Sequence, residues 1–217
     1  MRRSILLVVL MLALLVFAGC GGALDSDGDL VAEDRWLEVP GWEGTFMLRF
    51  SHDAVVESST ADGKRTSTEH RTAESEVSGS VVWDNNWRDY GWNGESRASG
   101  WYEQDLEQVV EESGERSVLR VSGEGQGDVT GKGRISINPD RGMYEIYFGL
   151  DPLEGEADGA FGRGPDEWKF FYHHLEDLPL PEEGMTLSGN ISVPTTWYHA
   201  EGTAVVTWEL NPMDPSR

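Results

Sequence analysis

Short apolar segments alternate with turn-forming residues from Gly41 to the end of the chain, and this pattern constrains the fold more than any other feature. Asn138-Pro139-Asp140-Arg141-Gly142 places a proline at the second position of a β-turn, between two apolar segments. Ala61-Asp62-Gly63-Lys64 contains the Asp-Gly pair that favours a tight hairpin. Short strands joined by such turns predict an all-β fold, either an antiparallel β-sandwich or a soluble β-barrel-like domain.

Several segments have the apolar content or the alternation of a β-strand, and two others are ambiguous. Residues 65–82 fit either a long, mostly exposed strand or a mobile loop, and residues 102–112 fit a helix or a strand equally well. We expect strands at residues 45–50, 55–56, 117–121, 134–138, 143–149, 168–173, 185–193 and 203–210.

Polar and glycine-rich residues between these segments predict further turns. Ser51-His52-Asp53 would separate two short strands, and Asp84-Asn85-Asn86 would connect two others. The Gly-Xaa-Gly stretches at residues 123–127 and 131–133 are followed by no helical pattern, so we interpret them as turns and not as phosphate-binding loops.

The first twenty residues have the composition of an export signal. Arg2 and Arg3 precede an unbroken apolar run, residues 5–18, which is shorter than the roughly 20 residues of a transmembrane helix. Phe17-Ala18-Gly19-Cys20 resembles the lipobox of a bacterial lipoprotein signal peptide, although the family usually has leucine where Phe17 stands. The resemblance implies cleavage before Cys20, lipidation of Cys20, and export to the cell envelope, on either the inner or the outer membrane.

This resemblance and the turn pattern together divide the chain into three parts. We expect a signal peptide at residues 1–19, a lipidated acidic tether at residues 20–40 and one antiparallel β domain at residues 41–217. Because Cys20 is the only cysteine, the domain has no intramolecular disulfide, and packing or a metal must stabilise it.

The chain is strongly acidic, with 39 Asp and Glu against 17 Lys and Arg and a formal net charge of -22. A field of this sign repels nucleic acids and anionic membrane surfaces, so we expect no DNA or RNA partner. Lysine is scarce, since only Lys64, Lys132 and Lys169 occur. This composition is typical either of protein surfaces adapted to high salt or of an exterior that binds calcium.

Residues 83–102 combine aromatic side chains with amides and carboxylates, a mixture that suits sugar recognition. Flat rings can stack on the C–H groups of a sugar while neighbouring polar groups bind its hydroxyls. The alternative is that the same rings pack in the core, where tryptophan is usually buried. The candidate ligand-binding residues are Trp83, Trp87, Tyr90, Trp92 and Trp101.

A second candidate site is a glycine-rich segment with several carboxylates. A flexible loop of this kind could wrap Ca²⁺, which takes six to eight oxygen ligands. A solvated acidic loop without any ion is the alternative, because the spacing matches no known calcium motif. No other cofactor is expected. The candidate calcium ligands are Asp151, Glu154, Glu156 and Asp158.

The sequence contains no nucleophile elbow, phosphate loop or zinc-protease motif. His173 and His174 are adjacent, so on a strand their side chains point to opposite faces, and we expect one buried and one exposed histidine. The sequence therefore favours a non-enzymatic envelope module that binds a glycan or another envelope protein. A polysaccharide hydrolase with paired carboxylates, and a purely structural lipoprotein with a salt-adapted surface, are the alternatives.

Overall fold

The fold is all-β, as predicted, with no α-helix among the residues that the structure describes. A computed structural model of the chain describes residues 34–36, 38–170, 174–197 and 200–216. Two 3-10 turns, η1 (Asp34–Trp36) and η2 (Pro139–Arg141), accompany the strands. The strands are β1 (Trp42–Ser59), β2 (Arg65–Arg88), β3 (Gly91–Glu112), β4 (Glu115–Asn138), β5 (Met143–Tyr147), β6 (Leu153–Gly159), β7 (Gly162–Trp168), β8 (His174–Pro179), β9 (Leu187–Trp197) and β10 (Ala200–Pro212).

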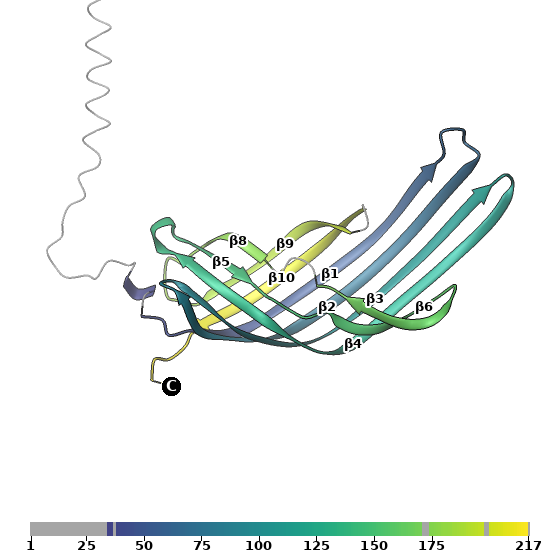
Figure 1. The fold of residues 1–217 in the computed structure, drawn as a ribbon. Helices are drawn as coiled ribbons and strands as arrows, with labels where there is room; N and C mark the ends of the chain where they lie inside the picture. The colour runs from purple at the N-terminus through teal and green to yellow at the C-terminus, as the bar shows by residue number, and fades with distance from the viewer. Residues whose placement is uncertain (1–33, 37, 171–173, 198–199, 217) are drawn as a thin grey trace, which may run out of the picture. The chain divides into compact units, whose positions relative to one another are not determined.

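All ten strands belong to one antiparallel sheet that does not close on itself. Its main order is β7-β6-β4-β3-β2-β1-β10-β9, and β5 pairs with both β4 and β8 beside this path. Strands β1 to β4 are much longer than the others, and Figure 1 shows their two hairpin tips projecting beyond the shorter strands. The last strand, β10, returns to pair with β1, where residues 42–51 lie opposite residues 203–212.

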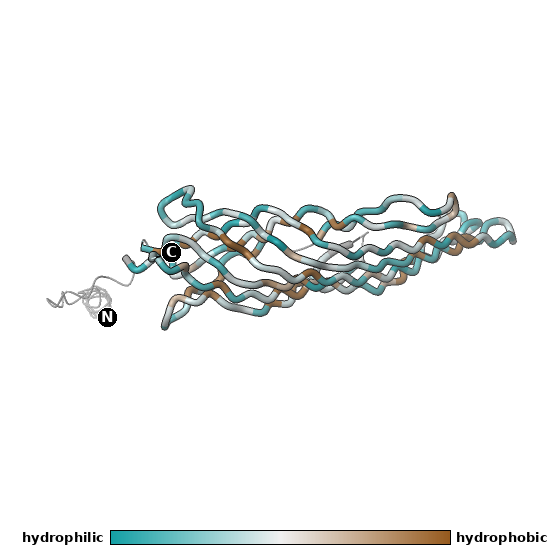
Figure 2. The backbone as a smooth tube through the Cα atoms, turned by 90° about the horizontal axis from the view of Figure 1, so that it is seen from below, coloured by the Kyte–Doolittle hydropathy of each residue, from teal (hydrophilic) through white to brown (hydrophobic). Residues whose placement is uncertain are grey.

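The sheet coils so that distant strands face one another across a single core, which gives a β-sandwich-like domain. Phe46 of β1 stacks on Phe148, which follows β5, at 4.8 Å between ring centroids. The indole nitrogen of Trp208 in β10 donates a 3.1 Å hydrogen bond to the hydroxyl of Tyr144 in β5. Apolar and polar residues alternate along the strands (Figure 2), so each strand gives one face to this core and the other to the outside.

The glycine-rich stretches 123–127 and 131–133 are not turns, which corrects the sequence-based prediction. They lie inside β4, where the core-facing residues from 123 to 133 are all glycine except Val129. A Cβ at Gly131 would sit 2.1 Å from the carbonyl oxygen of Gly149, and a Cβ at Gly133 would sit 2.5 Å from the ring of Trp83. These glycines therefore let strands and rings approach the backbone of β4 closely.

Two predicted turns are confirmed and two are wrong. Residues 61–64 connect β1 to β2, and residues 138–142 connect β4 to β5 with Gly142 in the left-handed region at φ 63°. The segment Ser51-His52-Asp53 instead lies inside β1, because His52 is buried and continues the core-facing alternation of Phe46 to Phe50. Asp84-Asn85-Asn86 belongs to β2, which carries a bulge there, and the turn follows at residues 89–90.

The ambiguous segments are strands. Residues 65–82 belong to β2 and residues 102–112 to β3, where cross-strand pairing overrides the helix-compatible spacing. The strand expected at 168–173 is wrong in its described part, since β7 ends at Trp168.

Two residues before Gly41 also contribute to the core. They are Trp36 and Val39, and both are buried in the hydrophobic core. Cys20 and the signal-peptide segment lie outside the described residues. Within the described part of the chain, no helix has both the length and the apolar character needed to cross a membrane.

Candidate functional site

The five candidate aromatic residues do not form one platform. Trp83 and Trp92 are completely buried, and they pack in the core with Trp42, whose ring lies 6.1 Å from that of Trp92. A buried indole cannot stack on a sugar, so the binding interpretation does not apply to these two residues. Their role is the alternative considered from the sequence, core packing.

Trp87 and Tyr90 lie at the hairpin that joins β2 to β3. Trp87 is 38% exposed, but the Arg88 guanidinium lies 3.5 Å from its ring centroid and covers part of that ring. Tyr90 is half-buried and packs against the core. The hairpin thus presents one partly covered indole and not an open aromatic surface.

Trp101 lies on the outer face of β3, with Glu76 and Gln126 opposite it on the neighbouring strands. It is half-buried. Ser99 stands two positions before it on the same face, about 7 Å along the strand. Trp101 lines a groove of about 550 Å³ with Glu124 and Glu156, whereas Ser99 lines a larger groove.

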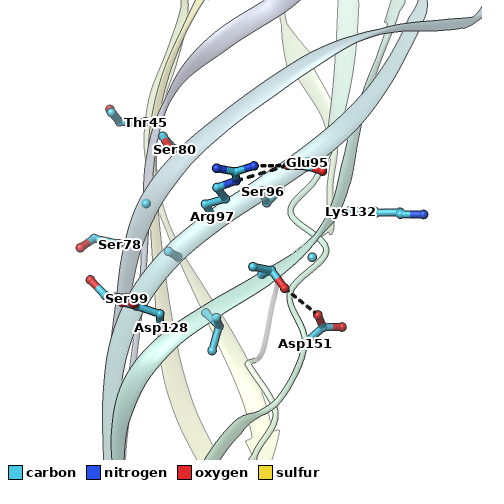
Figure 3. A pocket seen from close by; sticks show the side chains of 15 residues that line it. Thr45, Ser78, Ser80, Glu95, Ser96, Arg97, Ser99, Asp128, Lys132 and Asp151 are labelled. Atoms are coloured by element: carbon cyan, nitrogen blue, oxygen red, sulfur yellow. Dashed lines mark hydrogen bonds and ion pairs between the residues drawn. The ribbon is translucent and has the colours of Figure 1, made fainter.

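That groove crosses the outer face of β1 to β4 and has a volume of about 1060 Å³. Its lining combines hydroxyl groups with side chains of both charges (Figure 3). The register of the sheet assembles it, because Thr45, Ser80, Arg97 and Thr130 are successive cross-strand neighbours. The labelled side chains are Thr45, Ser78, Ser80, Glu95, Ser96, Arg97, Ser99, Asp128, Lys132 and Asp151.

Several charged groups of the groove make ion pairs or hydrogen bonds with other groups in it. The Arg97 guanidinium donates to Glu95 at 2.7 Å, two residues before it on β3. The Thr130 hydroxyl donates to a carboxylate oxygen of Asp151 at 3.2 Å, and the Asp151 amide donates to the Thr130 carbonyl at 2.7 Å. Lys132 points away from both pairs in Figure 3 and has no ion pair within the described residues.

The hydroxyls of the groove are available to a ligand. Thr45, Ser78, Ser80 and Ser99 are exposed, and no side-chain hydrogen bond inside the described ranges engages them. Each hydroxyl can donate one hydrogen bond and accept two. The arrangement can therefore bind a polar, hydroxyl-rich molecule that lies across the strands.

The four candidate calcium ligands are divided between two places. Asp151 lines the groove, whereas Glu154, Glu156 and Asp158 alternate along the exposed face of β6. The segment is a strand and not the flexible loop that the calcium interpretation assumed, so its carboxylates project in a row instead of wrapping an ion. The four do not converge at the donor spacing that a metal needs.

One further polar cluster lies on the core-facing side of β7 and has a structural role. Asp166 accepts hydrogen bonds from the Tyr102 hydroxyl at 2.9 Å and from the Gln104 amide at 2.7 Å. Burial, and then the hydrogen bond to Asp166, raise the pKa of the Tyr102 hydroxyl. A tyrosine in this state is a hydrogen-bond donor at neutral pH, and here it ties β7 to β3.

Sequence reasoning missed the groove, although part of its signal is present. Ser78 and Ser80 alternate with Val77, Gly79 and Val81, which is the pattern of a strand with one polar face. Nothing in that pattern says which strands lie beside β2, so the groove emerges only from the cross-strand register.

The structure tests only part of the histidine prediction. His174 is exposed on β8, and His173 and His199 lie outside the described residues. His174 has two glutamates, Glu145 and Glu176, as neighbours.

The chain matches no protein-family model, no curated protein and no solved structure.

Proposed function

We propose that this chain is a lipid-anchored envelope protein whose β domain binds a glycan, without catalysis, in the groove on the outer face of β1 to β4. The observation that carries the proposal is the group of unengaged hydroxyls that lines this groove, Thr45, Ser78, Ser80 and Ser99. The half-buried ring of Trp101 lies two residues after Ser99 on the same face of β3. Hydroxyls and charged groups would bind sugar hydroxyls, and the indole would stack on a sugar face. The lipobox-like residues ending at Cys20 support the anchor.

The charge pattern of the groove agrees better with a glycan than with a strongly charged partner. Arg97 and Glu95 neutralise each other, and the groove also carries Lys132, Asp128 and Asp151. Mixed charges of this kind orient a polar ligand without selecting for one sign. A protein partner and a purely structural role are the outcomes that the experiment must separate from glycan binding.

The test is co-sedimentation of the full-length chain with insoluble envelope polysaccharides at high salt, with an assay for released sugar. Trp101→Ala and Arg97→Ala should weaken binding at least about tenfold, equivalent to about 1.4 kcal/mol. Trp87→Ala is the matched control for the indole, because Trp87 is exposed away from the groove. Arg120→Ala is the control for the arginine, because Arg120 pairs with Glu107 elsewhere on the outer face.

Each outcome leads to a different conclusion. Binding that Trp101→Ala weakens and Trp87→Ala does not supports the groove as the site. Equal effects of the two indole variants would contradict that placement. Released sugar would show that the domain is a hydrolase and not a binding module. A complete lack of co-sedimentation would leave a protein partner or a structural role. The mass of the chain isolated from membranes tests separately whether Cys20 is lipidated.

A further inference from the structure

We propose that Glu145, His174 and Glu176 form a binding site for a divalent transition-metal ion of the Zn²⁺ class. One donor atom from each of the three residues can be chosen so that all three lie within 4.8 Å of one another. Among the described residues, this is the only group of histidine, cysteine and carboxylate side chains that converges in this way. The site is separate from the groove and does not depend on glycan binding.

Strand pairing builds the site from residues far apart in the sequence. His174 and Glu176 stand two residues apart on β8, so their side chains leave the same face of the strand. Glu145 lies on β5, between Tyr144, which is opposite Leu178, and Ile146, which is opposite Leu175. The outer face of this two-strand unit therefore carries all three donors, while Leu175 and Leu178 face the core.

A β-bulge places Glu176 and Asp177 opposite Glu145. The register between β5 and β8 shifts at Glu145, so that β8 carries an extra residue there. Asp177, which follows Glu176, adopts φ 52°, a left-handed conformation that is unusual for a residue other than glycine. Bulges and such strained residues are concentrated at functional sites, where they re-aim side chains.

The imidazole of His174 lies between the two carboxylates. Its Nε2 is 3.9 Å from Glu145 Oε2 and its Nδ1 is 3.5 Å from Glu176 Oε1. The Tyr147 ring packs edge-on against the imidazole at 6.1 Å and limits its rotation. Arg88 lies 3.9 Å from Oε1 of Glu145, which leaves Oε2 directed toward the histidine. Such outer contacts orient metal ligands.

The donor set favours a transition metal over calcium. Imidazole suits Zn²⁺, Cu²⁺ and Ni²⁺, whereas Ca²⁺ takes oxygen ligands almost exclusively. Ligands of tetrahedral Zn²⁺ lie about 3.3 Å apart, so the donors must close from their present spacing. Glu176 is 66% exposed at its side chain and can rotate to bring its carboxylate to the same imidazole nitrogen as Glu145. Water would complete the coordination.

The test is a Zn²⁺ titration of the full-length chain in excess Ca²⁺, which occupies non-specific carboxylate sites. We expect one saturable Zn²⁺ per chain and a shift of the His174 ring nitrogens in NMR spectra. His174→Ala should weaken binding more than the 10–100-fold typical for loss of an outer-sphere partner. Glu145→Gln and Glu176→Gln should each weaken it as well.

His70→Ala is the matched control. His70 is also an exposed histidine beside a carboxylate, with Asp53 at 2.9 Å, but no second carboxylate converges on it in the described structure. Unchanged Zn²⁺ binding by His70→Ala, together with loss in His174→Ala, supports the site. Binding that survives His174→Ala, or no saturable Zn²⁺ binding by the unmodified chain, overturns it. All four side chains are exposed or half-exposed, so these variants should retain the fold.

Discussion

At the residue scale, His52 is a polar side chain that the coiled sheet buries, at a cost in folding free energy. Its side chain faces the core in line with Phe50, on which it stacks, and only 4% of the residue is exposed. Burial lowers the pKa of His52 from its ordinary value of 6.5, and the backbone hydrogen bond with Glu201 offsets this only in part. The folded protein therefore holds this imidazole neutral under conditions in which the unfolded chain would protonate it.

This difference makes stability depend on pH. Below pH 6.5 the unfolded chain binds a proton that the folded chain resists, so the unfolding free energy should fall as the pH drops from about 7 to about 5. His52→Gln removes the titrating group and should flatten this part of the curve. Urea unfolding across that range measures the effect.

The matched control for this prediction is His70→Gln, since His70 is exposed beside Asp53. The plot of unfolding free energy against pH for His70→Gln should remain steeper below pH 7 than the plot for His52→Gln. Parallel curves for the unmodified protein and His52→Gln would contradict the prediction.

At the scale of one strand, the glycines of β4 show that the effect of a residue depends on how tightly it is packed. Gly127 and Gly131 lie four residues apart on the same face, yet their surroundings differ. A Cβ at Gly127 would make an ordinary contact of 3.7 Å with Leu153, whereas one at Gly131 would lie 2.1 Å from the Gly149 carbonyl oxygen. Only the second glycine is required by a close approach of backbone.

The two positions provide a paired mutational experiment. Gly131→Ala should lower the unfolding free energy by about 2–3 kcal/mol, because backbone must move to relieve the contact. Gly127→Ala should change it by less than about 1 kcal/mol, since alanine costs less conformational entropy than glycine and meets no clash. Denaturant unfolding of both variants measures the difference, and similar values for the two would show that the close approach does not matter.

These elements also show what the sequence could and could not predict. Turn chemistry is local, so the Asp62-Gly63 hairpin and the Pro139 turn were recognisable from the residues themselves. The role of Gly131 depends on Gly149, and convergence of Glu145 with His174 depends on β5 pairing with β8. Such contacts join residues far apart in the chain, and no local pattern encodes them. The all-β class was predictable, but the groove and the histidine site were not.

At the scale of the whole molecule, the sheet aligns some of the many acidic side chains in one like-charged row. Glu74, Glu103, Glu124 and Glu156 lie directly opposite one another in turn, on β2, β3, β4 and β6. Arg163 forms ion pairs with Glu124 and Glu156 at one end of the row. Like charges directly opposite on neighbouring strands are destabilising, and dissolved salt screens them.

The unfolding free energy should therefore rise with salt concentration. Glu103→Gln interrupts the row, and at low salt it should stabilise the domain by about 0.5 kcal/mol and reduce the salt dependence. The matched control is Glu57→Gln, because Glu57 lies opposite Thr68 and not opposite another acid. Denaturant unfolding in a salt series measures both variants, and equal salt dependence of the two would exclude the row as its source.

The pairing of β1 with β10 has a consequence for how the molecule comes to be folded. Residues 42–51 find their second neighbour only in residues 203–212, which are synthesised after β2 to β9. The hairpins from β1 to β4 can form among nearby residues as the chain emerges, but one side of β1 stays unpaired until β10 is available. Contacts of such long sequence separation slow folding. While β2 to β9 are being made, one edge of β1 thus stays open, and the core can be completed only once β10 has been synthesised.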